Sequence, residues 1–205
     1  MTLSPSSLTQ ESSTEHLFTT LLLKWIPAST RALELGSARF AAPLAEADVC
    51  VTVTADADAP DEESGRSPGL ERIPLHFPLG KADRERYGEA LEEASFDAVV
   101  LDGLKEAFTT DKLHELVREI DMVLKPSGVA LILLDAASLP QCLSPEFVIA
   151  LFERFGFALA ERKSAQSPVK LTSAGLVFVR DAARVRARKS LQGLLEEDRK
   201  TTTYK

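Results

Sequence analysis

The fold of this chain is decided by the stretch Arg31-Ala32-Leu33-Glu34-Leu35-Gly36-Ser37-Ala38-Arg39-Phe40. It begins as an apolar run that ends in Glu-Leu-Gly, and it continues through small residues into a pattern with helical spacing. This order predicts a strand over residues 32–35, a tight turn, and a short helix that reaches Glu46. In an open α/β sheet, the first such turn, at the carboxyl end of a central strand, is where nucleotide-like ligands most often bind.

Length and composition favour one folded domain with tails. The chain has 205 residues, of which 44% are hydrophobic, and this is enough for a single packed core. Its net charge of -7 argues against a surface built wholly to bind phosphates, so nucleic acid is expected only at the basic cluster over residues 184–189. No basic leader with an apolar core stands at the start, and no run approaches the roughly 18 apolar residues that span a bilayer. We expect a cytoplasmic protein with no membrane contact.

The two cysteines, Cys50 and Cys142, lie far apart and within apolar runs. This placement predicts buried free thiols rather than a disulfide or a catalytic nucleophile. Neither cysteine has another Cys or a His at ligand spacing, so the sequence predicts no metal site.

Changes in composition along the chain predict three segments. Residues 1–14 are rich in Ser and Thr and are expected to form a disordered tail. Residues 15–182 carry the folded domain, which opens with a helix over residues 15–25. Residues 183–205 contain basic residues followed by a run of mixed charge, which indicates a charged helix or tail with ion pairs between successive turns.

A second strand is predicted at residues 48–54, where a β-branched run ends at Ala55-Asp56-Ala57-Asp58. A carboxylate at this place is next to the first turn and can accept hydrogen bonds from a pair of ribose hydroxyls. Asp56 is the preferred residue for this role and Asp58 is the reserve. The alternative is that both residues only begin an acidic, solvated loop.

Two more strands are predicted in the middle of the chain. Residues 70–79 contain a short strand, which Pro74 restricts to an edge of the sheet. Residues 95–102 have a continuous apolar centre, which is typical of a strand covered on both faces. This strand ends at Asp102-Gly103-Leu104, again at the edge where ligands bind.

The last third of the chain predicts the rest of the sheet. A helix over residues 111–124 is expected to end at a turn containing Gly128, and a buried strand follows at residues 129–135. Residues 157–162 and 175–180 predict two closing strands, joined by a loop short enough for an antiparallel hairpin.

Four stretches in this order resemble the class I S-adenosylmethionine-dependent methyltransferases. They are Ala32–Gly36 for the first cofactor motif, Ser95–Val100 for the fourth strand, Leu124–Ile132 for the turn into the fifth strand, and Leu151–Phe157 for the last helix entering its hairpin. The resemblance covers about residues 17–180. It implies an α/β, Rossmann-like, doubly wound, seven-stranded and mostly parallel sheet with a C-terminal antiparallel hairpin.

The resemblance also implies a site for S-adenosylmethionine across the ends of the first, second and fourth strands. One group of residues would border the methionine part of the cofactor, one residue would hold the ribose hydroxyls, and a third group would flank the transferred methyl group and face the substrate. In that order they are Glu34, Gly36, Ser37 and Ala38; Asp56; and Asp102, Gly103 and Leu104. Methyl transfer needs mainly positioning of the nucleophile, so no catalytic residue is singled out.

Two functions are therefore open. The first is a class I methyltransferase that acts on a small molecule or a protein. The second is a pseudoenzyme, a scaffold or interaction module of the same fold without the cofactor, with a protein partner or as a homo-oligomer.

The second function follows from the first turn. Gly36 is the only glycine there, and the second function predicts that Ser37, Arg39 or Phe40 fills the cleft. Arg39 would also disfavour a cationic sulfonium. A nicotinamide-binding domain is a distant third alternative, because the turn lacks that family's glycine spacing.

Overall fold

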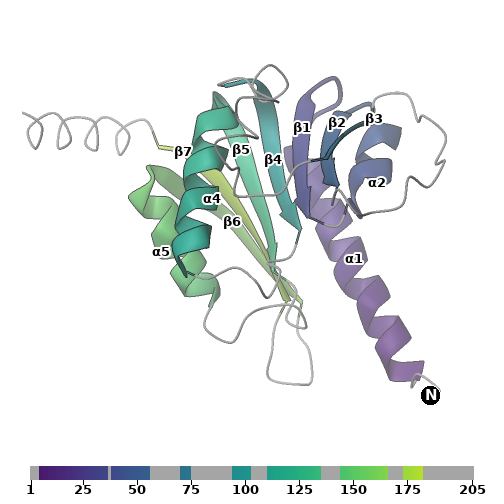
Figure 1. The fold of residues 1–205 in the computed structure, drawn as a ribbon. Helices are drawn as coiled ribbons and strands as arrows, with labels where there is room; N and C mark the ends of the chain where they lie inside the picture. Colours follow the sequence, from purple (N-terminus) through teal and green to yellow (C-terminus); the bar gives the residue numbers. More distant parts are fainter. Residues whose placement is uncertain are drawn as a thin grey trace, which may run out of the picture.

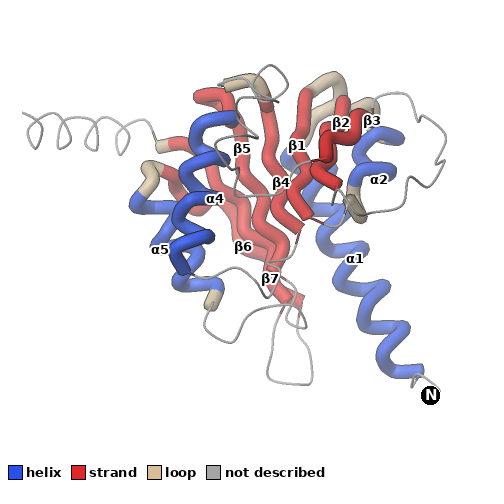
Figure 2. Tube along the Cα trace, viewed as in Figure 1, coloured by secondary structure: helices blue, strands red, loops and turns tan. Residues whose placement is uncertain are grey.

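The computed structural model describes residues 5–36, 38–55, 70–74, 94–102, 110–134, 144–165 and 173–181. Within these residues, seven strands form one sheet and helices cover both of its faces (Figures 1 and 2). The strands are β1 (Arg31–Gly36), β2 (Cys50–Ala55), β3 (Leu70–Pro74), β4 (Phe96–Asp102), β5 (Leu124–Leu134), β6 (Phe157–Ala165) and β7 (Ser173–Arg180).

The sheet has the strand order β3-β2-β1-β4-β5-β7-β6. Strands β1 to β5 pair in parallel, whereas β7 runs antiparallel to both β5 and β6. This confirms the predicted mostly parallel sheet with a closing antiparallel hairpin, and β3 with Pro74 is an edge strand as expected. The strand order reverses between β1 and β4, which is the place where open α/β sheets bind ligands at the carboxyl ends of the strands.

Two layers of helices enclose the sheet (Figure 1). Helices α1 (Pro5–Trp25) and α2 (Ala41–Glu46) cover one face, and α4 (Thr110–Val123) and α5 (Pro145–Arg154) cover the other. Because successive side chains of a strand point to opposite faces, Ala98 and Val100 of β4 join the α1 layer while Val99 and Leu101 join the α4 layer. All four side chains are buried, as expected for a strand covered on both sides.

Helix α1 is fixed to the far end of the sheet by polar and apolar contacts. The indole Nε1–H of Trp25 donates a hydrogen bond to Glu161 Oε2 on β6 at 2.6 Å, and Lys24 Nζ binds the same oxygen at 2.6 Å. Leu21 lies against Gly175 of β7 so closely that a Cβ on Gly175 would be 2.5 Å from Leu21 Cδ2. The helix therefore spans from β1 to the closing hairpin.

The side chain of Arg180 joins the end of β7 to the end of α4. Its Nη1 binds Asp121 Oδ1 at 2.6 Å, and its Nη2 donates to the carbonyl oxygens of Asp121 and, at 2.8 Å, of Leu124. The guanidinium also lies over the ring of Phe157, 5.5 Å from its centroid. One arginine thus connects α4, β5, β6 and β7.

Two boundaries differ from the expectation. Helix α1 begins at Pro5, so it includes residues that the sequence pattern assigns to a disordered tail. A proline is accepted at this first helical position. Gly128 lies within β5 rather than in a turn before it. The register explains this: Phe96 pairs with Leu124 and Ala98 with Val129, so residues 125–128 bulge opposite a single residue of β4.

Cys50 is exposed and free, which corrects the prediction that its thiol is buried. It is the first residue of β2 and lies at the rim of the sheet, between the buried residues Val49 and Val51. Cys142 lies outside the described residues. Among the helices that the structure describes, none is long and apolar enough to cross a membrane.

Candidate functional site

Four of the predicted site residues come together at the carboxyl ends of β1 and β4. Gly36 and Asp102 are paired neighbours in the parallel register, and Glu34 lies two pairs further back, opposite Val100. Ala38 follows directly in the turn toward α2. The other predicted residues, Ser37, Asp56, Gly103 and Leu104, and the reserve Asp58, lie outside the described residues, so their roles stay predictions.

Glu34 holds the turn from the inside. Residues two apart on a strand point to the same face of the sheet. The side chain of Glu34 therefore points to the same face as that of Ala32, which is the face covered by α1 and α2. Its side chain is fully buried, and Oε1 accepts a hydrogen bond from the backbone N–H of Phe40 at 3.0 Å. The carboxyl group therefore fixes the position at which the chain returns from the turn into α2.

Burial raises the pKa of the Glu34 carboxyl to about 7. The hydrogen bond from the backbone of Phe40 opposes this rise, the negative charge of Asp102 adds to it, and the positive charge of Arg39 opposes it. Removal from water is the largest effect because an ionised carboxylate loses its hydration in the protein interior. Near neutral pH, Glu34 is therefore divided between its neutral and ionised forms.

Two residues of the turn have left-handed backbone conformations. Gly36 has φ of 129°, and Ala38 has φ of 60°. A Cβ on Gly36 would lie 2.5 Å from the carbonyl oxygen of Asp102, a distance that real Cβ atoms do not reach. The single glycine of the motif is therefore required by the close approach of β4 as well as by its own φ.

Arg39 lies across the end of β4. Its Nη2 forms an ion pair with Asp102 Oδ1 at 2.6 Å, and its guanidinium stacks 4.7 Å from the ring centroid of Phe40. The side chain of Asp102 is 4% exposed and that of Arg39 is 33% exposed, so the carboxylate is enclosed while the arginine still reaches solvent. The sequence indicated that Arg39 would disfavour a cation at this edge. It did not indicate that Arg39 pairs with Asp102, which is 63 residues away along the chain.

Phe40 does not occupy the mouth of the site. Its ring is fully buried in the layer between the sheet and α1, where it meets Phe18 edge-to-face at 6.4 Å between centroids. Of the side chains proposed to fill the cleft, Arg39 is thus the one that lies at this edge, and Ser37 lies outside the described residues.

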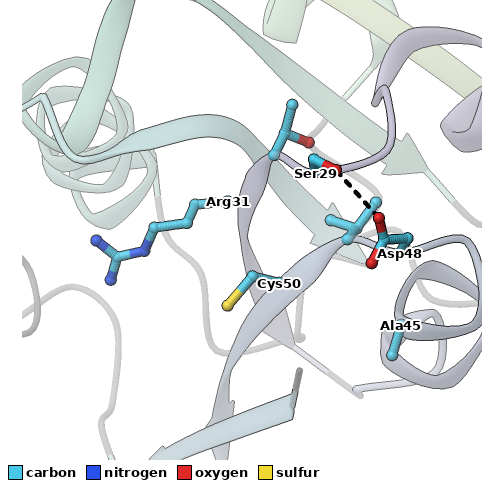
Figure 3. A pocket seen from close by; sticks show the side chains of 7 residues that line it. Ser29, Arg31, Ala45, Asp48 and Cys50 are labelled. Atoms are coloured by element: carbon cyan, nitrogen blue, oxygen red, sulfur yellow. Dashed lines mark hydrogen bonds between the residues drawn. The ribbon is translucent and has the colours of Figure 1, made fainter. Parts of the chain in front are cut away.

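A shallow hollow of about 300 Å³ lies at the opposite edge of the sheet, at the amino ends of β1 and β2 (Figure 3). Arg31 and Cys50 line it, and Ser29 Oγ–H donates to Asp48 Oδ2 at 3.0 Å on its rim. Because Gly36 and Asp102 are at the carboxyl ends, this hollow is separate from the predicted cofactor site. In the part of the chain that the structure describes, no group of three or more His, Cys, Asp or Glu residues is arranged to hold a metal ion.

The sequence matches no protein-family model and no curated protein. The structure, in contrast, is similar to solved methyltransferases. One is the 1,6-didemethyltoxoflavin-N1-methyltransferase of Burkholderia thailandensis, solved with 1,6-didemethyltoxoflavin and S-adenosylhomocysteine bound. It is 15% identical, with 82% of this chain and 78% of that chain covered and a TM-score of 0.64.

Two further solved structures have the same architecture. A TehB-like SAM-dependent methyltransferase from Corynebacterium glutamicum is 16% identical over 82% of this chain and 87% of its own, with a TM-score of 0.62. A putative sarcosine dimethylglycine methyltransferase from Galdieria sulphuraria is 16% identical over 86% of each chain, with a TM-score of 0.56. At these identities the likeness shows the fold: this chain has the Rossmann-like fold of class I S-adenosylmethionine-dependent methyltransferases.

Proposed function

We propose that this chain is a class I S-adenosylmethionine-dependent methyltransferase that acts on a small molecule or a protein. One observation carries the proposal: the turn after β1, closed on Glu34, meets the end of β4 at Gly36 and Asp102. This junction is at the strand-order reversal, where the fold accepts nucleotide-like ligands. Solved methyltransferases with the same architecture support it.

The residues at this edge have distinct parts in the proposed site. Glu34 keeps the turn in place through Phe40, and the turn at Gly36 and Ala38 would present its backbone to the methionine part of the ligand. Asp102 supplies an enclosed carboxylate next to the transferred group. When bound, the cofactor supplies a methyl group on a positively charged sulfur, and its transfer leaves a neutral thioether.

The residues fit the two forms of this ligand unequally. A carboxylate attracts a sulfonium cation, but Arg39 already compensates the charge of Asp102 at 2.6 Å. A neutral thioether meets no such conflict. These residues are therefore compatible with an adenosyl ligand. Their charges affect whether the site binds the sulfonium form or the thioether form.

Isothermal titration with S-adenosylmethionine and S-adenosylhomocysteine tests the proposal. We expect saturable binding of at least one ligand to protein whose circular dichroism shows a folded α/β domain. Asp102→Asn should change the affinity for the sulfonium ligand, while Asp97→Asn should leave it unchanged. Asp97 is a matched control because it lies on the same strand at the opposite edge and is also paired with a cation, Lys125, at 2.8 Å. No heat from either ligand at millimolar concentration would refute the proposal.

The second candidate is a scaffold or interaction module of the same fold without the cofactor, and the Arg39–Asp102 ion pair favours it. An arginine that remains on Asp102 would keep cations from the edge permanently. This function predicts no ligand heat in the titration, together with a homo-oligomer or a stable complex with a protein partner. Light scattering at micromolar protein concentration measures the homo-oligomer directly.

A further inference from the structure

An ion pair spans the crevice between β1 and β4. Gly36 and Asp102 are register partners at the carboxyl ends of these two strands, where the strand order reverses. Three residues after Gly36, Arg39 reaches back from the turn, and its Nη2 donates to Asp102 Oδ1 at 2.6 Å. The side chain therefore connects the turn after β1 to the end of β4, across the opening that a ligand at these strand ends has to enter.

The closed position of Arg39 is well defined. Its guanidinium stacks 4.7 Å from the ring centroid of Phe40, whose ring is fully buried. Asp102 is enclosed as well, since its side chain is 4% exposed. A charged hydrogen bond to an enclosed carboxylate, supported by stacking on a fixed ring, is stronger than an exposed ion pair. The closed arrangement is therefore the main one in the protein without a ligand.

Arg39 also has room to leave Asp102. Its side chain is 33% exposed, and among the residues that the structure describes, Asp102 is its only hydrogen-bond partner. Arg180 shows the contrast, because it binds the side chain of Asp121 and the carbonyl oxygens of Asp121 and Leu124 and is 18% exposed. Arg180 is thus fixed at several points, whereas Arg39 turns into solvent on the loss of one ion pair and one ring contact.

We infer that the Arg39–Asp102 ion pair is an autoinhibitory latch, which closes the crevice in the free protein and opens when an adenosyl ligand binds. The inference rests on the proposed function and adds a step that precedes binding. Because only the open form binds the ligand, the measured affinity is lowered in proportion to the fraction of molecules in which the pair is open. This reduction does not depend on the charge of the ligand's sulfur.

The test measures the dissociation constant of S-adenosylhomocysteine by isothermal titration for wild type and Arg39→Met, both shown to be folded by circular dichroism. The sulfur of this ligand is uncharged, so a change in affinity reports the latch rather than a charge on the transferred group. Methionine keeps an unbranched chain over Phe40 and removes the ion pair. Arg39→Met should bind about tenfold more tightly, as expected if the pair is open in about a tenth of wild-type molecules.

A double mutant shows whether this gain depends on the ion pair. Asp102→Asn leaves no carboxylate to hold Arg39, so adding Arg39→Met to it should change the dissociation constant by less than about twofold. Lys125→Met is the control. Lys125 is paired with Asp97 at 2.8 Å and is 39% exposed, but it lies at the amino end of β5. Its substitution should leave the dissociation constant unchanged.

Four results would contradict the inference. If folded Arg39→Met bound no more tightly than wild type, the latch would be overturned while the proposed function stands. If Arg39→Met gave the same gain with and without the Asp102 carboxylate, Arg39 would act on the ligand directly and not through the pair. Binding by Arg39→Met but not by wild type would mean that the pair does not open, and would favour the cofactor-free function. No binding by any folded variant would refute the proposed function and the latch with it.

Discussion

The carbonyl oxygen of Asp102 lies 2.5 Å from the point where a Cβ on Gly36 would stand, and the obstacle is backbone on a buried central strand. Gly36→Ala must therefore move β1 away from β4, and it must also hold an L-residue at φ of 129°. We expect a loss of about 3 kcal/mol in the free energy of unfolding, measured by urea denaturation.

Gly175→Ala is the comparison for this change. A Cβ on Gly175 would also be 2.5 Å from another atom, but that atom is Leu21 Cδ2, the end of a side chain that can change rotamer. The loss should be about 1 kcal/mol, well below that of Gly36→Ala. Equal losses in the two variants would show that the backbone of Gly36 carries no special strain.

The buried carboxyl of Glu34 predicts a pH dependence of stability. Its pKa is raised from 4.5 to about 7 in the folded state, so the folded protein binds more protons than the unfolded chain between these values. The stabilisation is complete below 4.5 and is lost as the pH rises through about 7. Glu34→Gln, which cannot ionise, should remove this slope.

Urea denaturation at about pH 5 and about pH 8 measures the effect of Glu34→Gln. The free energy of unfolding of the variant relative to wild type should increase by about 3 kcal/mol from the lower to the higher pH. The amide can still accept the hydrogen bond from Phe40, so the turn should stay in place. A difference that is independent of pH would contradict the assignment of the raised pKa to Glu34.

Arg180 predicts a loss of stability that depends on the shape of the guanidinium. Its Nη atoms bind Asp121 and the carbonyl oxygen of Leu124, so Arg180→Met leaves several acceptors without a donor. We expect a loss of about 2 kcal/mol in thermal or chemical unfolding. Arg180→Lys should recover only a minor part, because one ammonium cannot serve both sites. If Arg180→Lys had the stability of wild type, the positive charge of Arg180 alone would account for its contribution, and the shape of the guanidinium would not matter.

Trp25 is the single tryptophan and reports on the attachment of α1. Its Nε1–H donates to Glu161, so Glu161→Ala should release the indole and shift its fluorescence emission to longer wavelength, with stronger quenching by acrylamide. Glu146→Ala removes a comparable exposed ion pair with Arg162 on the other side of the sheet and should leave the emission unchanged. A wild-type spectrum in Glu161→Ala would mean that apolar contacts alone hold this end of the helix.

Local patterns predicted most of the fold because they report burial and backbone preference directly. The apolar centre of β4 matches its burial on both faces, and Pro74 marks an edge strand. The start of α1 at Pro5 was not predictable, since the residues before Glu15 have no apolar period.

The rest depends on pairing between distant residues. The bulge in β5 arises from its pairing with β4, whose register shifts between Phe96 and Ala98. The sequence of residues 125–128 does not predict this pairing. For the candidate site, the motif predicted Glu34 and Gly36 at the edge beside Asp102. The register pairs Gly36 with Asp102 and places Glu34 two pairs back, while the roles of these residues toward a ligand stay predictions. The ion pair of Arg39 with Asp102 required the fold, because the sequence does not say which of its 31 acidic residues faces this arginine.

The attachment of α1 to β6 and β7 determines when the domain can be completed during its synthesis. Trp25 and its acceptor Glu161 are separated by 136 residues, so the ribosome translates for on the order of ten seconds before the helix can meet the hairpin. Until then, the side chain of Leu21 lacks the strand against which it packs in the folded domain. The first helix of the domain is thus made early in synthesis but completed late.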